Sequence, residues 1–314
     1  MASNVSAPPT WSWRLADRVI RRTAPLAVGI VNVTSDSMYE GARSGTPAVA
    51  IEDGRKLAGE GFDMLDVGAV AARSGPPVPE DDEVAALVPA VEGLAGAGVP
   101  VSADTFVPEV ARRALDAGAV AVNDIGGGSE QMFELAAERG CGLVLMHIEG
   151  PPREERPLGR YEDVVEHLKG WFADRLEAAR ERGVAAEQIV LDPGLDFDLG
   201  VEDGLTVLAR LGELRELERP LYLSLSRKDF LGAVLAGSWE DRVPASGREW
   251  AAAAAAALAV AGGAEILRLH DASALQAVRI AGGISVGVRA EQSGKAAIAR
   301  RQAGGGGGVD GDAG

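Results

Sequence analysis

Short apolar runs alternate with amphipathic stretches over most of this chain. Eight runs are rich in Val, Ile and Leu, at 26–33, 62–68, 99–104, 119–124, 142–147, 188–192, 220–226 and 265–270. Runs of this kind favour strands that are buried on both faces, which is typical of a parallel sheet covered by helices. Between them, apolar residues recur three and four positions apart, and this predicts helices at 80–94, 108–117, 161–182 and 247–261.

The count of strand and helix pairs indicates the architecture. Eight β/α units predict a single α/β domain with the (β/α)8 TIM-barrel fold over residues 24–288, and a doubly wound open sheet is the alternative. In the extension at 1–23, the alternation of Trp11, Trp13 and Leu15 indicates a short hairpin that closes the bottom of the barrel. The tail at 289–314 loses apolar periodicity and contains five consecutive glycines, so we expect disorder there.

The charge balance narrows the range of partners. The chain has 47 Asp and Glu against 31 Lys and Arg, a net charge of −16, which disfavours nucleic acid and anionic membranes as partners. Its longest apolar stretch, 251–264, is too short for a membrane-spanning helix. A lone cysteine, Cys141, cannot form an internal disulfide and lies in an apolar run, so we expect a buried core residue and a cytoplasmic protein without a secretory signal.

Polar side chains follow the predicted strands, and in a TIM barrel the carboxyl ends of the strands form the active site. They are Asn32, Asp66, Asp104, Asn123, Asp124, His147, Asp192, Ser226, Arg227, Lys228, Arg268 and His270. Any one of the short polar residues could cap a helix, but a ring of eight positions is hard to explain by capping alone. His147 could be a site residue or a core histidine, whereas we expect His167, in a charged helix, at the surface.

The residues of this ring suggest two kinds of contact. Asp104, Asn123, Asp192 and Lys228 offer the acceptors and donors that a flat heterocycle such as a pterin or a purine needs. Asn32, Arg268 and His270 could instead converge on an oxyanion or a metal-bound diphosphate. The chain contains no phosphate loop of the G-x-x-x-x-G-K-[ST] type, no G-x-S-x-G elbow, no H-E-x-x-H and no pair of cysteines for zinc.

Seven short motifs follow one another in an unbroken order at the predicted strand ends. They are GIVNVTSDS from Gly29, VSADT from Val101, NDI from Asn123, MH from Met146, DPG from Asp192, SRK from Ser226 and RLHD from Arg268. Together they resemble the motifs of dihydropteroate synthase, the folate-pathway member of the pterin-binding TIM-barrel enzymes. The resemblance runs from about Leu26 to Ile284.

The resemblance implies a transferase that condenses (7,8-dihydropterin-6-yl)methyl diphosphate with 4-aminobenzoate to dihydropteroate and pyrophosphate, with Mg²⁺ as cofactor. It also implies a role for each matching position. The pterin would be held by Asp104, Asn123, Asp192, Phe197 and Lys228, and the diphosphate by Asn32, Arg268 and His270. Asn32 would also be the metal ligand, and the catalytic residues would be Asp104, Lys228, Arg268 and His270. Family members are commonly homodimers, and the alanine-rich helix 251–261 could form that interface or pack closely within the barrel.

The segments that resemble the second-substrate loops depart from the family pattern. The residues assigned to them are Ser35, Met38, Arg73 and Asp229. Ser35 and Met38 replace a Pro and a Phe, and residues 68–75 keep Arg73 but lose the Glu, Ser, Thr and Pro of the family's GGESTRPG. In the family's DPGxGFGK, two glycines are replaced by Asp196 and Asp198, which either raise the local negative potential or, as we expect, are solvated loop residues.

Three functions are compatible with an intact pterin ring and altered loops. The first, which we favour, is a dihydropteroate synthase with a relaxed 4-aminobenzoate pocket. The second is a pterin-dependent methyltransferase of the same barrel group, which the retained anion site disfavours because a methyl donor carries no diphosphate. The third is a pterin-binding paralogue with little or no synthase activity.

Overall fold

The computed structural model describes residues 10–33, 45–73, 75–154 and 161–285. Ser35 and Met38, two of the predicted second-substrate residues, lie outside these ranges, and so does the predicted tail at 289–314.

The described residues form one parallel sheet of eight strands and one antiparallel hairpin. The sheet consists of β3 (Leu26–Asn32), β4 (Met64–Gly68), β5 (Val101–Asp104), β6 (Ala121–Asp124), β7 (Gly142–Met146), β8 (Ile189–Asp192), β9 (Tyr222–Ser224) and β10 (Ile266–Leu269). Their order is β8-β7-β6-β5-β4-β3-β10-β9, and a parallel bridge between Leu191 and Leu221 brings the two edges together. All eight predicted strands are therefore present, and the sheet is a TIM barrel rather than an open sheet.

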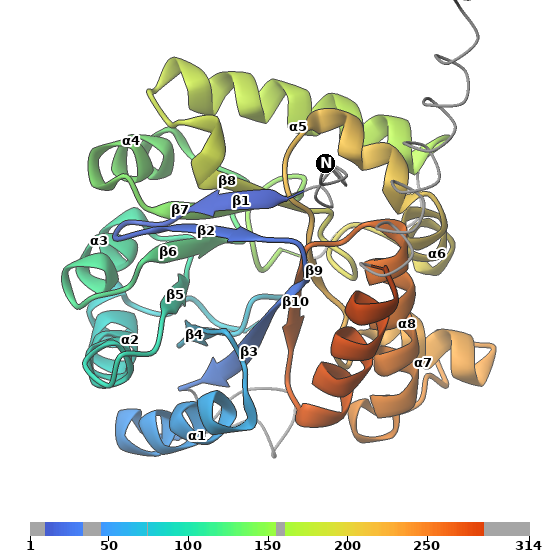
Figure 1. Cartoon of the computed structure of the whole chain (residues 1–314), viewed down its shortest axis with the longest axis horizontal. Coiled ribbons are helices and arrows are strands. Elements are labelled where there is room, and N and C mark those ends of the chain that lie inside the picture. Colours follow the sequence, from blue (N-terminus) through green and yellow to red (C-terminus); the bar gives the residue numbers. More distant parts are fainter. Residues whose placement is uncertain (1–9, 34–44, 74, 155–160, 286–314) are drawn as a thin grey trace, which may run out of the picture.

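Helices surround the sheet (Figure 1). They are α1 (Pro47–Glu60), α2 (Glu80–Ala95), α3 (Pro108–Asp116), α4 (Glu130–Arg139), α5 (Val164–Glu181), α6 (Val201–Ala209), α7 (Asp229–Ala236) and α8 (Glu249–Gly262), with 3₁₀ turns η2 (Ala186–Gln188), η3 (Leu211–Leu217) and η4 (Ala245–Gly247). A further helical stretch begins at residue 272. Their limits follow local signals: Asp163 caps α5 by accepting from the N–H groups of Val165 and Glu166, and Gly61, at φ 101°, ends α1.

The hairpin expected in the N-terminal extension is present. Strand β1 (Trp11–Arg14) pairs with β2 (Val19–Arg22), and the hairpin crosses the amino-terminal mouth of the barrel (Figure 1). The Trp13 side chain is fully buried against the barrel interior, and its indole N–H donates to the carbonyl of Gln188 at 2.8 Å. Apolar side chains therefore fill this end of the barrel, which leaves the opposite end for a site.

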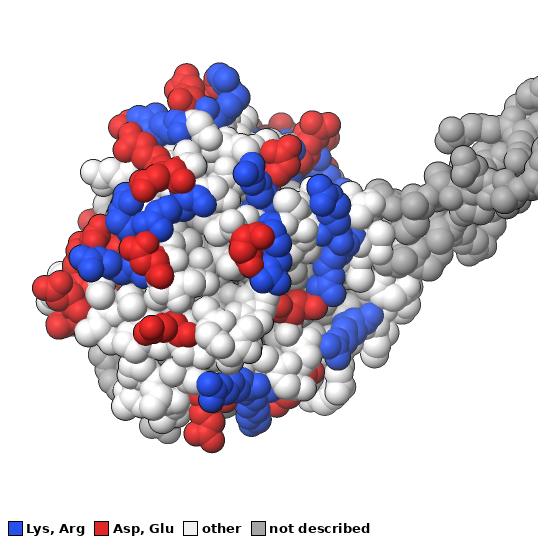
Figure 2. Space-filling view, turned by 60° about the vertical axis from the view of Figure 1, so that its left-hand side comes forward, with Lys and Arg blue, Asp and Glu red and all other residues white. Residues whose placement is uncertain are grey.

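The surface carries both signs of charge. Figure 2 shows basic and acidic side chains interspersed on the face that includes α3 and α4, where Arg112 pairs with Glu138 and Arg139 with Asp116. Cys141 is fully buried, and burial raises its thiol pKa to about 12, as expected for a core cysteine. Within the described residues, every helix is too short or too polar to cross a membrane.

Candidate active site

A pocket opens at the carboxyl ends of the barrel strands, where a TIM barrel places its active site. Each described residue to which the resemblance assigned a role lines it, whereas Asp66, Asp124 and His147 of the predicted ring do not. The residues with an assigned role are Asn32, Arg73, Asp104, Asn123, Asp192, Phe197, Lys228, Asp229, Arg268 and His270. These residues come from seven strands or the loops that follow them, so only closure of the barrel brings them together.

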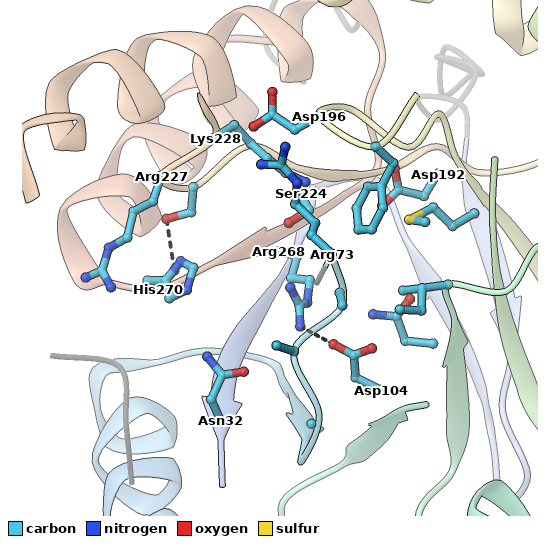
Figure 3. Close-up of a pocket in the computed structure, with 18 of the residues that line it drawn as sticks. Asn32, Arg73, Asp104, Asp192, Asp196, Ser224, Arg227, Lys228, Arg268 and His270 are labelled. Carbon is cyan, nitrogen blue, oxygen red and sulfur yellow. Dashed lines mark hydrogen bonds and ion pairs between the residues drawn. The ribbon is translucent and has the colours of Figure 1, made fainter. Parts of the chain in front are cut away.

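The pocket has two sides of different character (Figure 3). The carboxylates of Asp104 and Asp192 lie on one side, and Arg227 and His270 lie on the other. Five basic side chains, Arg73, Arg227, Lys228, Arg248 and Arg268, line the pocket with four aspartates. In a protein of net charge −16, the basic side chains at this point slightly outnumber the carboxylates, and those on the side of Arg227 can contact an anionic ligand.

Behind the pocket lies a buried carboxylate of the predicted polar ring, one to which the resemblance assigned no role. Asp66, in the middle of β4, accepts hydrogen bonds from Ser102 Oγ (2.5 Å) and Asn123 Nδ2 (2.8 Å). It also pairs with Arg268 Nε at 2.6 Å, while Arg268 Nη2 pairs with Asp104 Oδ2 at 2.6 Å. Asp66 therefore fixes two predicted site side chains, and its only sequence signal is a carboxylate inside the apolar run 62–68.

Burial shifts the protonation of the groups on the carboxylate side. Loss of hydration raises the pKa of Asp104 to about 7, although Arg268 opposes the shift. Burial likewise raises the pKa of Asp192 to about 6, against the attraction of Lys228. It lowers the pKa of Lys228 itself, because the ammonium is removed from water. Both aspartates can therefore gain or lose a proton near neutral pH, as acid–base groups in active sites do.

Lys228 is held in place by the loop that follows β8. Its Nζ donates to the carbonyl of Leu195 at 2.7 Å and lies 4.9 Å from the centre of the Phe197 ring. The ring and the ammonium thus form one wall of the pocket, on which a flat heterocycle could stack.

The prediction that Asp196 and Asp198 are solvated loop residues is wrong, because both side chains are buried. Asp196 accepts from the backbone N–H groups of Asp229 and Phe230, the first residues of α7. Asp198 accepts from the N–H of Glu149 at 2.7 Å. These carboxylates therefore satisfy backbone donors that would otherwise be buried without partners, and this is why they are drawn into the protein.

An ion pair joins the altered segment 68–75 to the start of α7. Arg73, in the loop after β4, donates to Asp229 Oδ2 at 2.6 Å, and Arg248 donates to the other carboxylate oxygen at 2.7 Å. Although burial opposes it, this pairing lowers the pKa of Asp229, so the carboxylate stays ionised. Arg73 and Asp229, both assigned to the second-substrate region, are therefore in direct contact.

The side of the pocket that carries Arg227 and His270 suits a diphosphate bound together with Mg²⁺. Burial and the charges of Arg227 and Arg268 lower the pKa of His270 well below its usual value, so this imidazole is neutral at pH 7 and can donate one hydrogen bond. Asn32 lines the same recess as Arg227 and His270 and offers one neutral amide oxygen. Mg²⁺ usually takes one or two protein oxygens with phosphate oxygens and water, and this donor set fits that pattern.

The two remaining histidines lie together behind the pocket. His147, which follows β7, is fully buried and does not line the pocket. Its Nε2 lies 3.3 Å from Nε2 of His167 on α5. His167 is partly exposed, with one-third of its side chain open to solvent, in line with the predicted surface position, but its ring also packs against Tyr161.

The fold and the pocket define a class of proteins: TIM barrels that bind a small polar molecule at the carboxyl ends of their strands. The basic side chains of this pocket suit a molecule that carries an anionic group. The sequence model of pterin binding enzymes matches residues 28–270. The chain therefore belongs to the family of pterin-binding enzymes.

The relatives of this chain are dihydropteroate synthases by name, in agreement with the resemblance of its motifs. A dihydropteroate synthase type-2 of Escherichia coli is 39% identical over 77% of this chain and 89% of its own length. An inactive dihydropteroate synthase 2 of Mycobacterium leprae is 35% identical over 84% of this chain and 91% of its own length. A solved dihydropteroate synthase from Xanthomonas albilineans, in complex with 7,8-dihydropteroate, superposes with a TM-score of 0.72 at 32% identity and covers 86% of this chain and 98% of its own.

Proposed function

We propose that this protein is a dihydropteroate synthase that condenses (7,8-dihydropterin-6-yl)methyl diphosphate with 4-aminobenzoate to 7,8-dihydropteroate and pyrophosphate. The observation that carries the proposal is the two-sided pocket, in which buried carboxylates face a cluster of basic groups. A substrate with a nitrogen-rich ring at one end and a diphosphate at the other matches both sides.

The carboxylates would bind the ring edge. Asp104 and Asp192 can each accept N–H bonds from a pterin, and Asn123, fixed by Asp66, offers an amide beside them. The ring would stack along Phe197 and Lys228. Asp104 would also have a second role. When the C–O bond to the diphosphate breaks, its electron pair stays on the oxygen, and positive charge is left on the pterin methylene. An ionised Asp104 would stabilise that charge.

The basic side would stabilise the leaving group. Arg268 and His270 can donate hydrogen bonds to phosphate oxygens, and Arg227 adds positive charge to the same recess. Mg²⁺, entering with the diphosphate and held by Asn32, would supply further charge neutralisation. The nitrogen of 4-aminobenzoate then bonds to the methylene carbon and releases a proton to solvent, a step that depends mainly on position.

Two further points belong to the proposal. The protein would act in the cytoplasm, as its sequence predicts. It would also form a homodimer through the outer faces of α7 and α8, where Leu235, Trp250 and Leu258 are more than half exposed. We expect Trp250→Glu to convert a dimer into a monomer in size-exclusion chromatography with light scattering, whereas Glu249→Gln, beside it, should leave the mass unchanged. A wild-type protein that is monomeric at micromolar concentration would contradict the dimer.

The test of the function is pyrophosphate release by the purified protein with the dihydropterin diphosphate and Mg²⁺, in the presence and absence of 4-aminobenzoate, with the product identified by mass. We expect dihydropteroate to form only when all three are present. Because one relative is named as inactive, turnover has to be measured and binding alone does not suffice. Tight pterin binding without condensation would contradict the synthase and favour the non-catalytic paralogue.

Lys228 provides a variant that tests the site itself. Lys228→Ala removes the ammonium beside Asp192 and Phe197, so we expect pterin binding to be abolished. Lys169→Ala is the matched control, because this lysine lies on α5 among Glu166, Glu213 and Glu216, outside the pocket lining. Unchanged pterin binding in the Lys228 variant would refute the assignment of the pterin residues.

A further inference from the structure

A cluster of metal-binding side chains lies outside the pocket, between the end of β7 and helix α5. It consists of His147, Glu149 and His167, whose ligand atoms all lie within 4.8 Å of one another. Met146 lines the pocket, whereas the next residue, His147, does not, as expected when successive side chains of a strand point to opposite faces. None of the three residues lines the pocket, so the cluster is separate from the site described above.

Two distances within the cluster match the edges of a metal coordination shell. His147 Nε2 and His167 Nε2 are 3.3 Å apart, and His167 Nε2 is 2.9 Å from Glu149 Oε1. Two ligand atoms bound to one Zn²⁺ at about 2.0–2.1 Å are about 3.3 Å apart at the tetrahedral angle and about 2.9 Å apart at a right angle. Both observed edges thus fall in the range that a single ion would impose.

A single cation can engage all three of these groups at once. A ring nitrogen of a neutral imidazole carries either one proton or one lone pair. His167 Nε2 lies within reach of both His147 Nε2 and Glu149 Oε1, so a single proton on it serves one strong hydrogen bond. A divalent cation would accept electron pairs from both imidazoles and the carboxylate together.

Neighbouring groups hold the three ligands in this geometry. The Tyr161 hydroxyl donates to Glu149 Oε1 at 3.1 Å, and Asp198 Oδ2 accepts from the backbone N–H of Glu149. Trp171 packs edge-on against His147, with ring centres 5.0 Å apart. Hydrogen bonds and packing of this kind orient the ligands in known metal sites. The chain has only three histidines, and two of them are used here.

We infer that His147, Glu149 and His167 form a binding site for a divalent transition-metal ion such as Zn²⁺. Two imidazoles and one carboxylate suit Zn²⁺ and its neighbours, whereas Mg²⁺ and Ca²⁺ prefer oxygen ligands. The side chains of Glu149 and His167 are 29% and 33% exposed, which gives an ion a path from solvent and leaves room for a water ligand. Bound metal would tie the segment after β7 to α5, so its role would be to stabilise the fold.

The first measurement is the affinity and stoichiometry for ZnCl₂ of chelator-treated protein without a purification tag, in competition with a chromogenic chelator. We expect one equivalent of zinc per chain and a thermal midpoint that rises by about 5 °C when zinc is in large excess over its dissociation constant. With CoCl₂ as the probe, visible absorption bands of four-coordinate Co²⁺ should appear. Less than about 0.2 equivalents of zinc would overturn the inference.

Variants locate the ion. His167→Gln and Glu149→Gln should each weaken zinc binding by at least about 100-fold, and Tyr161→Phe by about tenfold, the effect typical of a group that orients a ligand. Glu166→Gln is the matched control, since this exposed neighbour of His167 on α5 pairs with Lys169 and should leave zinc affinity unchanged. If His270→Gln removed zinc binding and His167→Gln did not, the ion would belong to the pocket and the inference would be wrong. The inference does not depend on the proposed synthase activity, because its readout is metal binding.

Discussion

At the scale of single residues, the pocket depends on how burial changes charge. Asp66, Asp104 and Arg268 form a compact group in which one guanidinium bridges two carboxylates. Such a group is favourable only when each charge has a partner, because desolvation of an unpaired charge costs several kcal/mol. The pairing therefore holds Arg268 at the junction of the two sides of the pocket.

The raised pKa of Asp104 leads to a prediction about pH. An ionised Asp104 is needed to stabilise a positive pterin methylene, and its pKa is about 7 because it is buried. We therefore expect kcat/KM for the dihydropterin diphosphate to fall as pH decreases through about 7. The check is a profile from pH 5 to 9, with aliquots returned to pH 8 to show that activity recovers. A rate constant that stays flat down to pH 5 would contradict this role.

Asp66 is a positioning residue in this arrangement. Asp66→Asn keeps the shape of the side chain but removes the charge that holds Arg268 Nε, so we expect a loss of about 3 kcal/mol in the free energy of unfolding and a kcat lower by about 100-fold. Urea denaturation and steady-state kinetics measure the two effects. Ser102→Ala, which removes one neutral donor to the same carboxylate, should cost only about 1 kcal/mol. Equal effects of the two substitutions would speak against the charge pairing.

At the scale of elements, loops fix the ends of helices around the pocket. The loop after β8 places Asp196 at the first backbone N–H groups of α7, and it places Leu195 under the ammonium of Lys228. The positive end of a helix dipole favours a carboxylate at that point. The loop and the start of α7 therefore act as one unit, which sets the wall of the pocket that carries Lys228.

Substitutions at Asp196 test this unit. Asp196→Ala leaves two backbone donors without their acceptor, so we expect the free energy of unfolding to fall by about 2 kcal/mol. Asp196→Asn retains one acceptor oxygen and should recover about half of that loss. Asp116→Ala is a suitable control, because its partner Arg139 lies at the surface and such pairs contribute at most about 1 kcal/mol. The free energy of unfolding of the three variants, measured by calorimetry or in urea, is the check. A loss for Asp196→Ala no larger than that for Asp116→Ala would contradict the capping role of Asp196.

At the scale of the whole molecule, one end of the barrel contributes to stability and the other end carries the ligand site. The amino-terminal end is closed by the hairpin β1–β2 and filled with apolar side chains, whereas the carboxyl end carries the pocket. A change at the closed end should therefore alter stability without altering the chemistry of the ligand site.

Trp13→Ala should lower the stability of the protein without changing its affinity for the pterin. The indole is fully buried, so its removal leaves a large cavity and an acceptor without a donor, and we expect a loss of about 4 kcal/mol. Pterin affinity, measured by calorimetry below the unfolding temperature, should stay within about twofold of the parent protein. Arg14→Ala, an exposed neighbour on the same strand, should change stability by at most about 0.5 kcal/mol. Loss of pterin affinity in the folded Trp13 variant would contradict the separation.

The periodic features of this protein follow from local patterns in its sequence. Apolar runs located the eight strands to within about two residues, and polar residues at the ends of six of these runs line the pocket. Both follow from local chemistry, since a strand buried on two faces has to be apolar and a strand end beside a ligand has to be polar.

Which of these residues come into contact depends on how the barrel closes. Arg73 and Asp229 are 156 positions apart, and Arg268 lies 202 positions from Asp66, so their contacts exist only because the sheet closes into a barrel. The sequence also gave no reason to bury Asp196 or to bring His167 to His147, because the donors and rings that receive them lie on other elements. Periodicity reports the environment of one position, whereas a hydrogen bond or an ion pair depends on the geometry of two.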